Sequence, residues 1–320
     1  MKLTFFGTSA AVPTRSRNVS GMALQLDQHS DWWLIDCGEG TQHQVLRSIY
    51  TLPRLSRIFI SHMHGDHCFG LMGLLATRGL QGAQDPVAIF GPRGLNDLFN
   101  SIRRACNMHF RYPVQIHECA GPEILIDDEE LTVRAVEVKH AGQTLAFVFE
   151  EKPRQGRFRA EEAQRLNIPF GPVLGRLKRG ERVTLDDGRE IDGATLVDPP
   201  QQGRKTVIIT DTRDASAVLP FAGNADLIVH EATYCEAERA QAIEHNHSTA
   251  GDAARLAAQA GASVLVMSHF SPRYDQPEPG LPRVHDLVVE ARAIFSGQVL
   301  AASDFMTVEV PRRGKPGTPA

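Results

Sequence analysis

The stretch Ser61-His62-Met63-His64-Gly65-Asp66-His67 places three histidines and one aspartate within six consecutive positions. The apolar run 57–60 before it predicts a short buried strand, and the run 71–75 after it predicts a helix. The cluster therefore lies on a strand-to-helix turn. Imidazole nitrogens and carboxylate oxygens are ligands that zinc prefers. Four such groups in so short a turn cannot all face one ion, so the spacing predicts two metal ions that share it. The structural alternative is a solvated histidine-rich loop.

Three further residues with metal-binding side chains each follow a predicted strand. His140 follows the strand 131–138, Asp211 follows 206–210, and His269 follows 264–268. A single histidine after a strand is more often a packed or surface residue than a ligand. The repeated context favours convergence of these side chains with the turn at one edge of a sheet.

The length and composition are those of an ordinary globular protein. The chain has 320 residues, 42% of them hydrophobic and 22% charged, with a net charge of −4, which is enough to bury a large core. No segment approaches the length of a membrane span, and residues 1–7 predict a first strand rather than a signal peptide. The five cysteines form no CxxC pair, a pattern typical of free thiols in a reducing cytoplasm.

The region 151–202 differs from the rest in charge and in turn residues. Residues 152–182 contain nine basic and three acidic side chains, a net charge of +6, and prolines and glycines interrupt the region. This pattern predicts a protruding basic arm, with a hairpin turn at Asp186-Asp187-Gly188, that can contact phosphates. A solvated charged excursion is the alternative. We therefore expect a catalytic domain from 1–150 and 203–310, an inserted arm at 151–202 and a flexible tail at 311–320.

Several motifs together resemble one protein family. They are the stretch 36–42 (DCGEGTQ), the HMHGDH turn at 62–67, HEATY at 230–234, HST at 247–249 and SHFS at 268–271. The turn resembles that of the metallo-β-lactamase superfamily. The other motifs, with a basic arm that contains Gly171-Pro172, resemble the short-form tRNA 3′-processing endonucleases of the ribonuclease Z family.

This resemblance implies an α/β fold, an αββα sandwich with its site at one edge of the paired sheets. It implies two Zn²⁺ ions per subunit, although the ligand set also suits Mn²⁺, Co²⁺ or Fe²⁺. One ion would be bound by His62, His64 and His140, the other by Asp66, His67 and His269, and Asp211 would bridge them. Asp36 would orient a ligand histidine by a hydrogen bond, or it is simply a turn residue at a strand end.

The family resemblance also implies the reaction. The expected activity is endonucleolytic removal of 3′ trailers from precursor tRNA, which leaves a 3′-hydroxyl on the tRNA and a 5′-phosphate on the trailer. Asp66 would accept or orient the proton of the attacking water. His247 would be the general acid, with Glu231 positioning its ring and raising its pKa. The segment 246–249 also reads as a helix N-terminus capped by Ser248 or Thr249.

Recognition and assembly follow from the same resemblance. We expect a cytoplasmic homodimer in which the arm of one subunit holds precursor tRNA for the other, with no membrane partner. The expected RNA-contacting residues are Arg17, in the loop 13–18, and, in the arm, Gly171, Pro172, Arg176, Lys178 and Arg179. Two alternatives remain: a hydrolase of small phosphodiesters or sulfate esters, and a non-catalytic RNA-binding scaffold.

Overall fold

The computed structural model describes residues 1–275 and 282–312. It divides into two compact units. The larger comprises Met1–Glu150 and Lys205–Pro311, and the smaller comprises Glu151–Arg204 together with Arg312. Residues 313–320 of the predicted tail lie outside the described part of the chain.

Two seven-stranded sheets form the larger unit. The first has the order β16-β1-β2-β3-β4-β5-β6, with bounds β1 Lys2–Gly7, β2 Gly21–Gln25, β3 Trp32–Cys37, β4 Leu55–Phe59, β5 Val87–Gly91, β6 Val114–Glu118 and β16 Thr307–Glu309. The second has the order β15-β14-β13-β12-β9-β8-β7, with bounds β7 Glu123–Asp127, β8 Leu131–His140, β9 Gly142–Glu151, β12 Lys205–Ile209, β13 Leu227–Glu231, β14 Val264–Ser268 and β15 Gln298–Ala301.

Parallel strands form one side of each sheet. β3 to β6 pair in parallel in the first sheet, and β12 to β15 do so in the second. Strands covered on both faces carry nearly continuous apolar runs, as in Val264-Leu265-Val266-Met267. Because parallel strands end at the same edge, the residues that follow β12, β13 and β14 are brought together.

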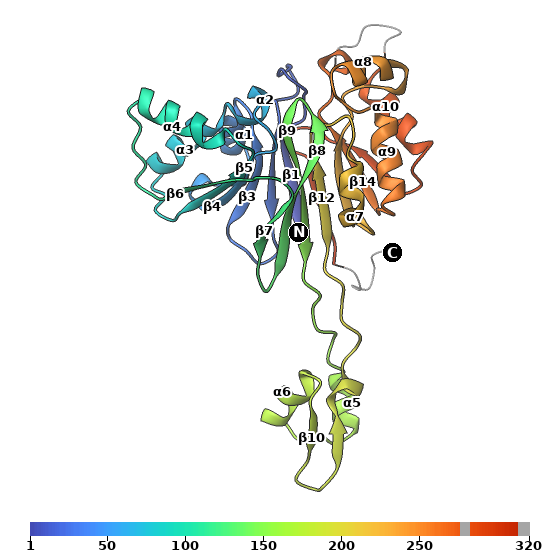
Figure 1. Cartoon of the computed structure of the whole chain (residues 1–320). Coiled ribbons are helices and arrows are strands. Elements are labelled where there is room, and N and C mark those ends of the chain that lie inside the picture. The colour runs from blue at the N-terminus through green and yellow to red at the C-terminus, as the bar shows by residue number, and fades with distance from the viewer. Residues whose placement is uncertain (276–281, 313–320) are drawn as a thin grey trace. The chain divides into compact units, whose positions relative to one another are not determined.

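Helices cover the outer faces of both sheets (Figure 1). On the first sheet these are α1 Thr41–Leu46, α2 Gly65–Cys68, α3 Leu71–Leu80 and α4 Leu95–Ala105; on the second they are α7 Leu219–Ala222, α8 Arg239–Glu244, α9 Ala250–Gln259 and α10 Val284–Arg292. One apolar cluster lies between the sheets and includes Phe5, Trp33 and Phe147. A second apolar cluster lies between the first sheet and its helices, and a third lies between the second sheet and its helices. The layer order is therefore αββα. Single 3₁₀ turns occur at η1 Leu52–Arg54, η3 Ser216–Val218, η4 Glu236–Glu238 and η5 Pro272–Tyr274.

The smaller unit has a core of its own. It contains α5 Ala160–Arg165, α6 Pro172–Lys178, β10 Arg182–Thr184, β11 Glu190–Asp192 and η2 Gly193–Leu196, packed around buried side chains such as Leu177 and Leu196. β10 and β11 pair antiparallel, so the predicted hairpin at Asp186-Asp187-Gly188 is confirmed. The two helices were not predicted, because short helices between prolines and glycines give no periodic apolar pattern.

Two elements of the larger unit differ from those that the sequence predicts. The sequence predicts a helix over about 41–50, whereas α1 ends at Leu46. β7 was not predicted, although its central Ile124-Leu125-Ile126 favours a strand, and it pairs with β8. Among the helices of residues 1–275 and 282–312, none is long and apolar enough to cross a bilayer.

Candidate active site

The HMHGDH turn continues directly from β4 into α2. Ile60 N still donates to Phe90 O of β5, at 2.8 Å, and α2 then begins after His64, so that Asp66 lies in its first turn. A β-carbon on Gly38 would lie 2.2 Å from Asp66 O. Glycine at this position therefore lets the loop after β3 pack against the turn and fix it.

His62, His64, His140 and Asp211 form the first cluster of potential ligands. His64 Nδ1 lies 3.0 Å from His62 Nε2 and 3.3 Å from His140 Nε2. Asp211 Oδ2 lies 3.7 Å and 3.8 Å from the same two Nε2 atoms. Three ring nitrogens and one carboxylate oxygen therefore converge on one point.

The second cluster consists of Asp66, His67, Asp211 and His269. Asp211 Oδ1 lies 3.1 Å from His269 Nε2 and 3.3 Å from His67 Nε2. Asp66 Oδ2 lies 3.4 Å from each of these nitrogens. Each oxygen of Asp211 thus faces a different cluster, which is the arrangement a bridging carboxylate requires.

The donor atoms fit divalent metal ions. The buried atoms His67 Nε2 and Asp211 Oδ1 have no hydrogen-bond partner among the described residues, and a buried polar atom without a partner is costly. Ligand nitrogens bound tetrahedrally at about 2.0 Å lie about 3.3 Å apart. The spacings of 3.0–3.3 Å in the first cluster match this value. A divalent metal ion would therefore satisfy both the unpaired atoms and the crowded nitrogens.

The protonation states of three site residues are strongly perturbed. Burial opposes ionisation of Asp211, but the imidazoles of His269 and His67 hold its pKa well below the usual range. Burial, together with the neighbouring His67, lowers the pKa of His62 to about 2. Burial also opposes the charged form of His67, yet the carboxylates of Asp211 and Asp36 raise its pKa well above the usual value. The site thus stabilises positive charge beside Asp211, so a metal ion bound there would displace the His67 proton.

Asp36 fixes two of the histidines. Its Oδ2 accepts from His67 Nδ1 at 2.6 Å and from Ser61 Oγ at 2.9 Å. Ser61 Oγ in turn lies 3.0 Å from His62 Nδ1. These bonds turn the Nε2 atoms of both histidines toward the clusters. The backbone of Asp36 is left-handed, with φ 56°, a conformation that is uncommon for residues other than glycine.

Two more histidines are fixed from other elements. His140 Nδ1 donates to Asn246 O at 2.8 Å, and His269 Nδ1 lies 3.0 Å from Thr233 Oγ1. Thr233 Oγ1 in turn donates to Glu231 Oε2 at 2.5 Å. The backbones of His269 and Asn246 are also left-handed, with φ 57° and 60°. Backbone conformations of this kind concentrate at functional sites.

His247 lies beside the metal clusters and is paired with Glu231. His247 Nδ1 donates to Glu231 Oε1 at 3.0 Å and lies 4.0 Å from Asp211 Oδ2. Although burial opposes the charged form, the Glu231 carboxylate raises the pKa of His247 to about 9. Thr249 caps α9 with a capping box, so the prediction that residues 246–249 form a helix N-terminus is also confirmed. The cap fixes the backbone two residues after His247.

Comparisons with known proteins agree with this geometry. The ribonuclease Z of Nostoc punctiforme is 49% identical over 314 residues, which cover 98% of this chain and 97% of the relative. The chain belongs to the ribonuclease Z family. The short form of human tRNase Z superposes with a TM-score of 0.70 at 28% identity, over 97% of this chain and 100% of that one. The metallo-β-lactamase fold protein YhfI of Bacillus subtilis superposes with a TM-score of 0.66 at 18% identity, over 96% and 98%. The αββα fold prediction is confirmed. A family model described as anti-Pycsar protein Apyc1 matches residues 1–145.

Arg17 of this ribonuclease Z chain lies in a packed environment. Its guanidinium donates at 2.7 Å to Thr8 Oγ1 and to Ala302 O, and it lies over the ring of Phe270. Asp275 is 3.5 Å away. These contacts give Arg17 a structural role in the loop 13–18, and the proposed phosphate contact remains a prediction.

The arm residues expected to contact RNA lie in or beside α6 and are Gly171, Pro172, Arg176, Lys178 and Arg179. Arg176 and Arg179 both pair with Glu181, at 2.9 Å and 2.8 Å, and the Lys178 ammonium lies 5.7 Å from the centre of the Phe158 ring. Over Glu151–Arg204 the sequence has eleven basic and nine acidic side chains, a net charge of only +2. The acidic residues after 182 therefore offset much of the basic charge of α6.

Three residues that position ligands, Ser61, Asn246 and Thr233, were not identified in that role from the sequence. Ser61 directly precedes His62, and that position was its only signal. Asn246 acts through its backbone carbonyl, which leaves no sequence signal. Thr233 lies inside the HEATY motif, and its position two residues after Glu231 was the available signal. The site otherwise brings together all seven residues predicted as ligands, and the ligand roles themselves are part of the proposal below.

Proposed function

We propose that this chain is a metal-dependent phosphodiesterase that cuts 3′ trailers from precursor tRNA endonucleolytically, leaving a 3′-hydroxyl and a 5′-phosphate. The supporting observation is full-length similarity to a named ribonuclease Z together with a site that has both metal clusters and the His247–Glu231 pair. A non-catalytic scaffold has no need of buried ligands with unpaired atoms, so the site favours catalysis.

The metal centre would contain two Zn²⁺ ions. His62, His64 and His140 would hold one, and Asp66, His67 and His269 the other, with Asp211 bridging. Two such ions in this position lower the pKa of a bound water and offset the charge that develops on the phosphate. Their ligand histidines are already oriented, which reduces the cost of assembling the site.

His247 and Asp66 would move the protons. His247 is charged at neutral pH because Glu231 stabilises its imidazolium, so it can protonate the 3′ oxygen as that oxygen leaves. Asp66 would accept or orient the proton of the attacking water. Its Oδ2 is fixed by the backbone N–H of Ala11 at 2.9 Å.

The smaller unit would bind tRNA, and the chain would act as a homodimer. Exposed Phe170 precedes Gly171, whose φ of 151° and open surroundings leave room for close backbone approach. Arg176, Lys178 and Arg179 would contact backbone phosphates. The five free cysteines support a reducing compartment, the cytoplasm.

The structure suggests a clean deletion to test this proposal. Glu150 of β9 lies opposite Lys205 of β12 in antiparallel register, so a two-residue turn can replace Glu151–Arg204 without disturbing the sheet. We expect the full chain to cut a defined precursor tRNA at one site, as seen by sequencing both products, and the deletion variant to lose this activity while retaining hydrolysis of a small chromogenic phosphodiester. Equal loss on both substrates contradicts a recognition role for the smaller unit. Failure of the full chain on precursor tRNA contradicts the proposed function.

A further inference from the structure

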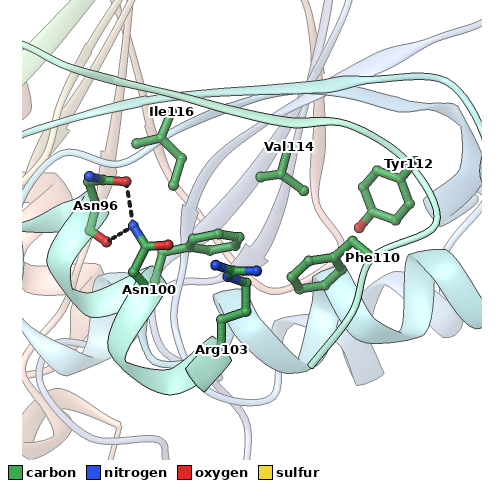
Figure 2. Close-up of a pocket in the computed structure, with 8 residues that line it drawn as sticks. Asn96, Asn100, Arg103, Phe110, Tyr112, Val114 and Ile116 are labelled. Atoms are coloured by element: carbon green, nitrogen blue, oxygen red, sulfur yellow. Dashed lines mark hydrogen bonds between the residues drawn. The ribbon is translucent and has the colours of Figure 1, made fainter. Parts of the chain in front are cut away.

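A cavity of about 360 Å³ lies between α4 and β6 (Figure 2), and no residue of the two metal clusters lines it. Its apolar wall is formed by Phe99, Phe110, Val114 and Ile116. The rings of Phe99 and Phe110 are 5.6 Å apart and nearly parallel, at 21°. A planar aromatic ligand such as a nucleobase can extend a stack of aromatic side chains of this kind.

The rim of the cavity carries groups that can hydrogen-bond to a base. Asn100 Nδ2 donates to Asn96 Oδ1 at 2.8 Å and to Asn96 O at 2.9 Å, as Figure 2 shows. Within the described part of the chain, Asn96 Nδ2 and Asn100 Oδ1 have no partner. The rim therefore presents one donor and one acceptor, the combination that reads the edge of an unpaired base.

Positively charged residues lie among and beside the lining residues in the sequence, and one of them lines the cavity. Arg103 lines it, and the exposed residues Arg104 and Arg111 lie close to it in sequence. None of the three forms an ion pair with any residue within 1–275 and 282–312. Residues 93–111 contain four arginines and one aspartate, a net charge of +3 on a chain whose total is −4. Unpaired guanidinium groups beside an aromatic pocket are complementary to a single-stranded nucleic acid.

One end of the cavity, at Asn96, lies at the edge of the sheet where β4 enters the HMHGDH turn. β4 and β5 are parallel neighbours. β4 leads into the HMHGDH turn and β5 leads into α4. Glu118 Oε1, at the end of β6, accepts from Gly94 N at 2.8 Å and from Asn96 N at 2.9 Å, which fixes the start of α4 at this edge. The cavity runs from Asn96 along about two turns of α4, or about 11 Å, to Arg103, toward the edge where β6 starts at Val114. A strand that enters at Asn96 would therefore follow it away from the metal centre.

We propose that this cavity binds a nucleobase of the single-stranded 3′ trailer, downstream of the cut, while Arg103, Arg104 and Arg111 contact the flanking phosphates. This inference rests on the proposed function and adds a trailer subsite to it. The base stacks on Phe110, and the asparagine pair contacts its edge. The subsite makes the reaction sensitive to trailer length, because a one-nucleotide trailer does not reach it.

The test compares two precursor tRNAs that differ only in their trailers, one of a single nucleotide and one long. The variants are Phe110→Leu, which keeps apolar volume but removes the stacking surface, and the surface double variant Arg103→Ala/Arg104→Ala. The matched control is Arg54→Ala, an exposed arginine just before β4 that does not line the cavity. We expect each test variant to lower kcat/KM on the long trailer by about fivefold or more, the loss typical of one stacked base, and to leave the short-trailer precursor unchanged.

Other outcomes are equally clear. An equal loss on both precursors, or no loss on either, overturns the trailer subsite while the proposed function stands. If the unaltered chain cuts neither precursor, the proposed function fails and this inference fails with it. A binding assay tests the subsite directly, with a fluorescent purine in a single-stranded trailer oligonucleotide. If the unaltered chain quenches this purine and Phe110→Leu quenches it less, the subsite is supported. If Phe110→Leu quenches it equally, the subsite is overturned.

Discussion

The Glu231–His247 pair gives a prediction with a magnitude that follows from the structure. Glu231 is buried and accepts from His247 Nδ1 at 3.0 Å and from the backbone of Thr212 at 2.6 Å. Glu231→Gln keeps the shape and a hydrogen-bonding oxygen but removes the charge. The pKa of His247, raised to about 9 by Glu231, should then fall to about 6.5 or below, since burial opposes the charged imidazole.

The rate effect follows from the protonated fraction of His247. At pH 7.5 a group with a pKa of about 9 is ~97% protonated, and one with a pKa of about 6.5 is ~9% protonated. If His247 is the general acid, Glu231→Gln should lower the rate about tenfold at pH 7.5. At pH 6, His247 of the same variant is still ~76% protonated, so most of the loss in rate should disappear. The basic limb of the pH–rate profile should move down by about 2.5 pH units.

The assay is single-turnover cleavage of one precursor tRNA across this pH range, because product release does not affect that rate. Glu244→Gln, an exposed carboxylate on α8, is the matched control and should behave as the unaltered chain. His247→Ala should be slower by about 10²-fold below about pH 9 and should lose the basic limb, so that the difference narrows at higher pH. A Glu231→Gln variant that is as slow at pH 6 as at pH 7.5 refutes the argument from charge.

Three further predictions concern metal binding and stability. Asp36→Asn removes the acceptor of His67 Nδ1 and should weaken metal affinity about 10- to 100-fold in chelator competition. The control Asp31→Asn should not weaken it. Equal metal affinities of Asp36→Asn and the unaltered chain contradict the positioning role of Asp36. Removing metal should lower the unfolding temperature, because His67 Nε2 and Asp211 Oδ1 then lack partners. Adding metal back at about 100 times its Kd should restore about 2.7 kcal/mol of unfolding free energy. An unfolding temperature that does not change with metal contradicts the ligand assignment. Thr249→Ala removes the capping box of α9 and should cost about 1 kcal/mol in urea unfolding, and an unchanged midpoint would show that the cap is not stabilising.

The sequence by itself determined the layered fold and the composition of the site. The apolar runs of β12, β13 and β14 are long enough to predict buried strands, and each ends at a polar residue of the site. The spacing in the HMHGDH turn predicts two metal ions, and the structure places the side chains of the turn in two groups of potential ligands. These signals are local, since ligand spacing and strand patterning are both read within a few residues.

Contacts between distant segments were decided only by the tertiary structure. The hydrogen bond from His247 to Glu231, the carbonyl of Asn246 at His140 and the left-handed backbone of Asp36 all depend on packing between elements. A sequence specifies which groups are available, but their pKa values and orientations depend on the distances that the folded chain sets between them.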